Sequence, residues 1–189
     1  MATDEADRRL AAPGDLELVR DFVNTRDLEK GTDRIDGPEK LASWSAEKRL
    51  VTAEVPRPTR ADVERVLRLR EALRAMLLAN AGFPLVSRSV EEFNEASHGA
   101  RLGVRAGDDG RVALLAAGEG IDRAVGRLLS VVVAAQGDGT WERLKACAGC
   151  QWALYDRTKN RSAAWCDAAK CGARARSRRY RARRRGTPA

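Results

Sequence analysis

Residues 147–185 read CAGCQWALYDRTKNRSAAWCDAAKCGARARSRRYRARRR, and this stretch contains every cysteine of the 189-residue chain. The four are Cys147, Cys150, Cys166 and Cys171, so that two, fifteen and four residues separate successive cysteines. Two close pairs joined by a loop of this length supply the four ligands of a tetrahedral Zn²⁺ site. Four thiolates fill the tetrahedron and leave no position for a reacting water. The spacing therefore predicts a structural zinc ion rather than a catalytic one.

Two disulfides, or four ordinary buried thiols, are the alternatives for these cysteines. The chain opens with MATDEADRRLAAPGD. Because this stretch shows no apolar signal segment, we expect the protein to stay in the reducing cytoplasm, where disulfides are rare. Unrelated thiols would not normally gather within 25 residues. The zinc interpretation is favoured, and the only histidine, His98, lies far upstream and is expected to be an ordinary surface or core residue.

The segment between the two cysteine pairs is predicted to form a hairpin. Residues 151–155 (QWALY) and 161–165 (RSAAW) have strand-like composition, and residues 156–160 (DRTKN) have the composition of a turn. A helix is then expected to begin at Cys171 and to continue through the arginines, since the next proline is Pro188. This order is that of a treble-clef-like finger. We expect its apolar cover to come from Trp152, Leu154, Tyr155 and Trp165.

The same stretch resembles the CGNR zinc finger. The matching residues, in the family's order, are Trp152, Asp156, Asn160-Arg161-Ser162, Trp165-Cys166 and Cys171-Gly172-x-Arg174. Ala173 stands where the family's name-giving Asn is expected, so any contact of that amide is lost or replaced. Residues 15–25 (DLELVRDFVNT) resemble the ABATE domain that usually precedes this finger. The two resemblances imply a stress-responsive transcriptional regulator of bacteria.

The charge of the chain is unevenly divided. The whole sequence has 35 Lys and Arg against 27 Asp and Glu, but residues 141–189 alone hold 14 basic and 3 acidic side chains, a balance of +11. The remaining 140 residues carry a balance of −3. A mildly acidic body with a strongly basic end predicts a polyanionic partner, because each neutralised phosphate releases counterions.

Residues 172–185 contain eight arginines and no acidic residue. In a helix, four of them share one face, namely Arg174, Arg178, Arg181 and Arg185. Three more are expected on a neighbouring stripe, namely Arg176, Arg179 and Arg183. A milder stripe is expected to pack against the finger, namely Ala173, Ser177 and Tyr180. Like charges this close repel one another, and a polyanion would relieve the repulsion.

Double-stranded DNA is the expected partner, because the planar guanidinium group matches phosphate oxygens and the guanine edge. The expected contacts are Arg174, Arg178 and Arg181, flanked by Arg161, Arg176 and Arg179. The alternatives are an RNA- or ribosome-associated protein, a module that docks on the transcription machinery, and a solvated basic tail. A membrane-surface helix is disfavoured because residues 172–185 contain no Leu, Ile, Val, Phe or Trp.

Upstream of the finger the sequence predicts a mainly helical α+β fold. We expect residues 1–12 to be disordered, residues 13–139 to form a sensor or dimerisation domain, and residues 140–186 to form the finger. The residues Gly137-Asp138-Gly139 are expected to be a hinge between the two. A Cys166→Ser substitution is accordingly expected to unfold the finger and to leave residues 15–136 folded.

Helical spacing of apolar residues predicts a first helix from Asp15 to about Arg26 and a second that starts at Pro38. Within these, Asn24 is expected to be a local cap or a buried hydrogen-bonding residue, and Trp44 a core residue. The third helix is expected to start near Thr59 and to end before Gly82. Its arginines are expected to be a mostly solvated face, namely Arg65, Arg68, Arg70 and Arg74.

Ser89 is expected to cap a fourth helix. Alternation around Asp108-Asp109-Gly110 then predicts a β-hairpin from Leu102 to Leu114. The very apolar residues 121–136 predict a last helix at the centre of the core.

We expect no enzymatic activity. One histidine and four zinc-committed cysteines leave no nucleophile pair, and the sequence has no phosphate-binding glycine-rich loop. No apolar stretch approaches the ~20 residues needed to cross a bilayer, so a cytoplasmic protein, nucleoid-associated when bound to DNA, is expected. A small-molecule effector and a second copy of the chain are further expected partners, and the sequence does not identify the ligand-binding residues.

Overall fold

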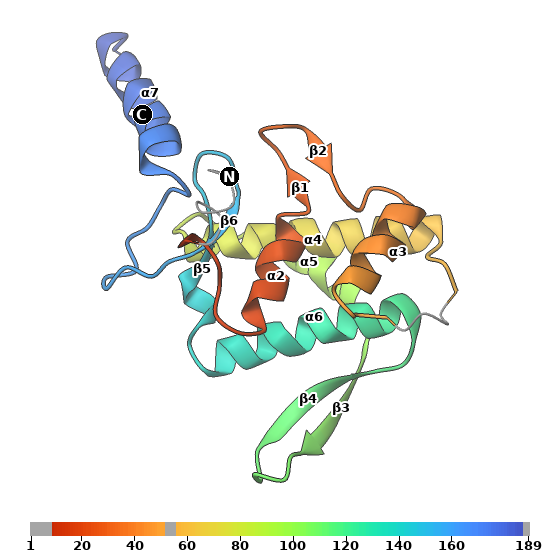
Figure 1. Cartoon of the computed structure of the whole chain (residues 1–189). Helices are drawn as coiled ribbons and strands as arrows, with labels where there is room; N and C mark the ends of the chain where they lie inside the picture. Colours follow the sequence, from red (N-terminus) through yellow and green to blue (C-terminus); the bar gives the residue numbers. More distant parts are fainter. Residues whose placement is uncertain (1–8, 52–55, 187–189) are drawn as a thin grey trace.

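The computed structural model describes residues 9–51 and 56–186, and it confirms the predicted mainly helical α+β fold. Two long helices, α4 (Arg60–Asn80) and α6 (Gly120–Gly137), lie across the middle of the molecule (Figure 1). Shorter helices and antiparallel hairpins surround them. No helix in the described part of the chain has the length and apolar character needed to span a membrane.

The chain enters the core through α2 (Leu16–Val23), which buries Val19, Phe22 and Val23. The short strands β1 (Arg26–Asp27) and β2 (Thr32–Asp33) follow and pair with each other. Helix α3 (Pro38–Glu47) begins with proline as predicted, because the missing N–H of proline is not needed in the first helical turn. The core position predicted for Trp44 is confirmed, and its ring centroid lies 5.4 Å from that of Phe22.

Helix α4 begins where the sequence predicts. The hydroxyl oxygen of Thr59 accepts a hydrogen bond from the backbone N–H of Asp62, and the Asp62 carboxylate accepts one from the backbone N–H of Thr59. This capping box satisfies two N–H groups that have no partner within the helix. Helix α5 (Ser87–Ser97) packs against α4, and Ser89 lies inside it rather than at its cap.

The expectation of a solvated arginine face on α4 is wrong for Arg70 and Arg74, which are 1% and 2% exposed. Arg70 donates to both carboxylate oxygens of Asp33 at 2.8 Å. Arg74 donates to the backbone oxygen of Val23 at 2.7 Å and to the carboxylate of Glu71 at 3.0 Å. A buried cation is tolerated only when it is paired. Helical periodicity could not show this, because Asp33 and the backbone oxygen of Val23 lie outside α4, and only Glu71 is a neighbour on the same helix.

Strands β3 (Arg101–Ala106) and β4 (Val112–Ala117) form the predicted hairpin, with Ala106 opposite Val112. The base of the hairpin packs against α6. A Cβ atom at Gly126 would lie 3.3 Å from the Cβ of Ala116, so glycine allows this close approach. Helix α6 is buried along most of its length and confirms the predicted central helix.

The hairpin predicted between the two cysteine pairs is wrong. Strand β6 (Ala153–Tyr155) pairs instead with β5 (Leu144–Ala146), which precedes the first cysteine. Both strands are buried along their whole length, whereas residues 161–165 are exposed or half-buried and form no strand. A buried strand pairs with another buried strand, because both must satisfy backbone groups away from water. The first cysteine pair therefore lies in the turn of the β5–β6 hairpin.

The β5–β6 hairpin is part of the main apolar core. Leu144, Ala146 and Ala153 belong to the same buried cluster as residues of α2, α4 and α6. Residues 1–8, part of the stretch expected to be disordered, lie outside the described residues. Residues 9–12 are ordered, since the backbone N–H of Tyr155 donates to the backbone oxygen of Leu10 at 2.9 Å.

Candidate metal centre and basic helix

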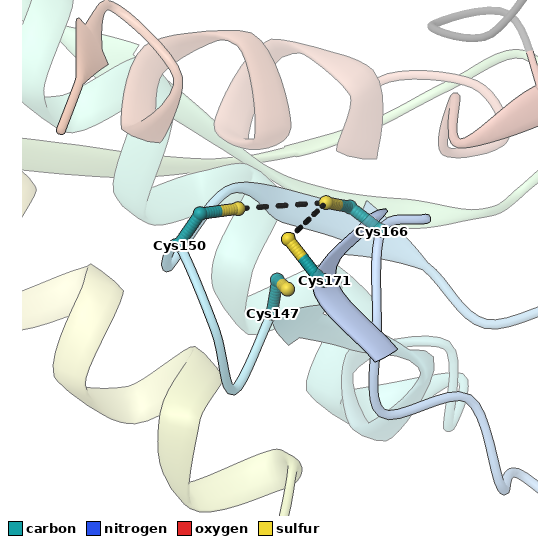
Figure 2. Close-up of side chains that lie close together, drawn as sticks. All are labelled: Cys147, Cys150, Cys166 and Cys171. Atoms are coloured by element: carbon teal, nitrogen blue, oxygen red, sulfur yellow. Dashed lines mark hydrogen bonds between the residues drawn. The ribbon is translucent and has the colours of Figure 1, made fainter. Parts of the chain in front are cut away.

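The four cysteines converge on one point, although they come from the β5–β6 turn and from a segment about fifteen residues later (Figure 2). None forms a disulfide, and their sulfur atoms all lie within 4.8 Å of one another. The Sγ atoms of Cys150 and Cys166 are 3.4 Å apart, and those of Cys166 and Cys171 are 3.8 Å apart. Sulfur atoms at the corners of a tetrahedron around Zn²⁺, with Zn–S of about 2.3 Å, are about 3.8 Å apart. The geometry fits zinc.

The first two ligands are held by a tight turn. The backbone N–H of Gln151 donates to the backbone oxygen of Cys147 at 2.8 Å, and the N–H of Gly149 points at the Cys147 sulfur at 3.4 Å. A Cβ atom at Gly149 would lie 3.2 Å from the Cβ of Cys171. Glycine therefore lets the two halves of the site approach each other closely.

The last ligand is held by a separate turn. The Asp167 carboxylate accepts hydrogen bonds from the backbone N–H groups of Ala169 and Lys170, at 2.7 and 3.0 Å. This caps a single wide helical turn, Ala168–Gly172, which buries Cys171 and leads directly into α7 (Ala173–Arg184). The basic helix, predicted to begin at Cys171, begins two residues later at Ala173 and continues from this turn without a break. Cys171 is thus a metal ligand within the turn that leads directly into the basic helix.

The thiols lie close enough together for the protonation of one to affect the pKa of another. Hydrogen bonds from the Cys150 and Cys166 thiols lower the pKa of Cys147, and hydrogen bonding to Cys147 in turn raises the pKa of Cys166. One negative charge is easily held here, whereas further thiolates repel it and need a divalent cation. A zinc ion supplies that charge and links the two turns.

A buried ion pair shapes the loop between the cysteine pairs. The carboxylate of Asp156 accepts hydrogen bonds from Lys145 Nζ at 2.8 Å, from both the N–H and the hydroxyl of Thr158, and from the N–H of Ala163 at 2.9 Å. Burial opposes the charged form, but these hydrogen bonds outweigh it and lower the pKa of Asp156 to about 2. Lys145 also donates to the backbone oxygen of Arg161. Lys145 is therefore a buried structural residue and not part of the positive surface.

Helix α7 projects away from the rest of the molecule (Figure 1), and none of its residues is buried. Arg176, Arg179 and Arg183 were expected on a stripe next to that of Arg174. They lie instead on the opposite face of the helix. Nine residues, or two and a half turns of about 3.6 residues, separate Arg174 from Arg183. Tyr180, expected to pack against the finger, is 61% exposed.

Two basic residues at the start of α7 are paired with one carboxylate. Glu29, in the β1–β2 turn, forms ion pairs with Lys170 at 2.9 Å and with Arg174. Among the described residues, no carboxylate lies within ion-pair distance of the six other arginines of α7, which are Arg176, Arg178, Arg179, Arg181, Arg183 and Arg184. The outer part of the helix is a cationic rod without internal counter-ions.

The β5–β6 hairpin, whose turn carries Cys147 and Cys150 (the zinc turn), is joined to the N-terminal part by hydrogen bonds that sequence reasoning did not find. The side chain of Asn24, predicted to be a cap or a buried hydrogen-bonding residue, is buried and bonds both the N–H and the C=O of Ala153 at 2.7 and 2.9 Å. Arg74 donates to the backbone oxygen of Gln151 at 2.9 Å, and Asn80 to that of Leu144 at 2.9 Å. Each partner is a backbone group, so no side-chain pattern in the sequence signals it.

Of the predicted DNA contacts, five lie on α7. Arg161 lies in the loop after β6, with a half-exposed side chain that is 4.0 Å from Glu142. The structure does not bring Arg161 onto the same element as the others, because its backbone is held by Lys145.

Together, the fold and the site define a zinc-finger protein, with a structural metal site and a mainly helical N-terminal part. The profile of the ABATE family, described as "Putative stress-induced transcription regulator", matches residues 16–149. The profile of the CGNR zinc finger matches residues 143–184. The chain belongs to the ABATE family and carries a CGNR zinc finger, and the zinc is structural. No curated protein matches the chain.

Proposed function

We propose that this protein regulates transcription by binding double-stranded DNA, with α7 lying in the major groove. The observation that carries the proposal is the distribution of arginines on opposite faces of an exposed helix that lacks internal counter-ions. A helix in the major groove has the phosphates of one strand on each side of it. Arginines on two opposite faces can therefore contact both groove walls, whereas a single basic face would suit one wall only.

The dimensions of α7 suit this arrangement. A helix with its side chains is about 10–12 Å across, which fits the width of the major groove, about 12 Å. The 12 residues of α7 give it a length of about 18 Å along the groove, at about 1.5 Å per residue. The helix follows directly on the turn Ala168–Gly172, in which the sulfur of Cys171 belongs to the zinc site, so the direction of the helix is fixed at one end. A rod with a fixed origin loses less entropy on binding than a flexible tail.

The arginines differ in how free they are to bind. Arg178 and Arg181 on one face, and Arg176 and Arg179 on the opposite face, lie beyond the Glu29 contact. None of the four has an ion-pair partner among the described residues, so they are the candidates for contacts with the two groove walls. Arg174 shares Glu29 with Lys170 and must exchange that carboxylate for a phosphate. Arg161 would flank the helix and contact a phosphate outside the groove.

One observation favours RNA as a second candidate. The exposed ring of Tyr180 has the guanidinium of Arg184 5.7 Å from its centroid. Exposed aromatic rings with neighbouring arginines stack on the bases of single strands. The proposed role of the N-terminal part is to bind a small effector or to mediate oligomerisation, and the proposal includes no enzymatic activity.

Competition between duplex DNA and single-stranded RNA for the full-length, zinc-loaded protein tests the proposal. We expect duplex DNA to win and the log of the affinity to fall with log salt at a slope of about −5, which corresponds to about six neutralised phosphates. Arg178→Ala should weaken DNA binding without changing zinc content. The matched control is Arg68→Ala, an exposed arginine on α4 that should leave binding unchanged. Preference for RNA, or equal effects of the two variants, would rule out the proposed groove contact.

A further inference from the structure

The β3–β4 hairpin projects from the body on the far side from α7 (Figure 1). Several of its apolar side chains are exposed. Val104 is 72% exposed and Val112 is 66% exposed, and Leu102 and Leu115 are also exposed. A two-stranded hairpin is marginally stable in water by itself. Exposed apolar surface of this kind marks an interaction site.

A cleft of about 740 Å³ runs beside this hairpin. Four consecutive residues of β4, residues 112–115, line it, and no residue of β3 does. Consecutive residues of a strand point to opposite faces. A cleft that reaches all four must therefore follow the edge of β4 that does not pair with β3. The opposite wall is apolar and includes Val131, Val133 and Ala134 of α6.

We propose that a second copy of this chain occupies the cleft. In this dimer the β4 strands of two copies pair antiparallel about a two-fold axis and form a four-stranded sheet in the order β3–β4–β4–β3. Each copy supplies a strand to the other copy's cleft, so the interface is self-complementary, as two-fold symmetry requires.

The distribution of charge selects β4 as the pairing edge. Strand β4 reads VALLAA and has no charged residue, so that two copies meet without repulsion. Strand β3 carries Arg101 and Arg105, which would face arginines of the other copy if the β3 edges paired. Strand β4 also lacks the lysine or proline that commonly blocks an exposed edge.

The charged groups of the cleft favour an apolar strand over a small anionic ligand. Arg127 is paired with Asp15 at 2.8 Å. The Asp138 carboxylate accepts hydrogen bonds from the N–H and the hydroxyl of Thr140, at 2.9 and 2.6 Å. What remains for an occupant is apolar side-chain surface and the outer backbone edge of β4, where the described residues supply one hydrogen bond, from Arg123 to the Ala116 oxygen at 3.4 Å. This is the chemistry of an added strand.

Sedimentation of the full-length protein tests the proposal, which does not depend on DNA binding. We expect the wild-type protein to sediment as a dimer. Leu115 lies near the middle of β4. Pairing of the two β4 strands about a two-fold axis therefore places Leu115 of one copy close to Leu115 of the other. Leu115→Lys and Leu115→Glu should each weaken dimerisation by about tenfold or more, with circular dichroism and zinc content unchanged. An equimolar mixture of the two variants should dimerise again, because opposite charges then meet.

The control is Val86→Lys, which adds the same charge at a 58% exposed position outside the hairpin and should leave the dimer intact. A monomeric wild-type protein would overturn the proposal and leave the cleft to an apolar small molecule or an extended peptide of another protein. A dimer that persists in both Leu115 variants would place the interface elsewhere and would equally overturn it. Loss of the dimer without recovery in the mixture would contradict β4 pairing about a two-fold axis.

Discussion

The β5–β6 zinc turn and α7 are adjacent in the chain and are built in opposite ways. The two strands that carry the turn are buried, the backbone of Ala153 and Gln151 is hydrogen-bonded to Asn24 and Arg74, and Lys145 of β5 is neutralised by Asp156. Helix α7 has no buried residue, and its outer arginines lack carboxylate partners among the described residues. Near the start of the helix, Asp156 neutralises Lys145, and Glu29 pairs with Lys170 and Arg174. The outer arginines of α7 remain available to bind an anionic partner.

The largest expected effect tests whether the zinc turn belongs to the core. Structural zinc contributes on the order of 10–16 kcal/mol in finger peptides, as much as the whole stability of a typical domain. Cys166→Ser should remove the zinc. Because β5 and β6 belong to the main core, we expect the N-terminal part to be destabilised as well, with a fall in Tm of about 10 °C or more.

Thermal unfolding followed by circular dichroism, with zinc measured by a colorimetric chelator, checks this prediction. Ser162→Ala, four residues away, is the control and should keep both the zinc and the Tm. The sequence alone favoured an N-terminal domain that stays folded in Cys166→Ser. An unchanged Tm would restore that view and would mean that the finger folds independently.

The next effect concerns the hydrogen bonds that cross between the two parts. Asn24→Ala leaves a buried N–H and a buried C=O of Ala153 without partners, and each unsatisfied group costs about 1–3 kcal/mol. We expect a loss of about 2–5 kcal/mol in urea denaturation. Asn94→Ala, at an exposed position on α5, should cost less than about 0.5 kcal/mol. Equal small effects would show that the Asn24 contacts do not hold the turn.

The sequence predicted the features that depend on local spacing. The cysteine pairs, the start of α4 near Thr59 and the turn of the β3–β4 hairpin each follow from residues close together in the chain. The pairing of β6 with β5 rather than with residues 161–165 was not predictable, because composition shows strand character and not which strand is the partner. Burial decided that choice.

The site was predictable to a similar degree. The four ligands are evident from their spacing, and an exposed basic helix from its composition. Counting charges overestimated the positive surface, because Lys145 is buried against Asp156, and Lys170 and Arg174 share Glu29. Asp156 was visible only through the family resemblance. One of its partners, Thr158, is two residues away, but Ala163 and Lys145 are 7 and 11 residues away and are brought to it by the fold.

A smaller effect concerns the Asp156 ion pair. Its folded pKa of about 2 lies below the ordinary value of 3.8, so the carboxylate contributes stability that is complete above pH about 4 and is lost as the pH falls through 2. The shift corresponds to about 2 kcal/mol. Asp156→Asn should therefore be less stable at pH 7 by about this amount, and the difference from the wild type should shrink between pH 4 and 2.

Urea denaturation of both proteins across this range measures the difference. The cysteine ligands also take up protons in acid and release zinc, but this occurs in both proteins and cancels in the comparison. Asp108→Asn, in the exposed β3–β4 turn, is the control and should show no such pH dependence. A difference that stays constant with pH would mean that Asp156 acts through its shape and not through its charge.

The smallest expected effect lies at the one described ion-pair contact between α7 and the N-terminal part. Hydrogen bonds from Arg174 and Lys170 lower the pKa of Glu29, so the carboxylate is charged at neutral pH and competes with phosphate for both cations. Glu29→Gln removes this competition. If α7 binds DNA, the affinity should rise by roughly threefold and the salt slope should steepen by about one phosphate. Glu91→Gln removes an exposed negative charge on α5 and should change neither quantity. Weaker DNA binding by Glu29→Gln would show that the main effect of the carboxylate is to orient α7, and not to compete with phosphate for Lys170 and Arg174.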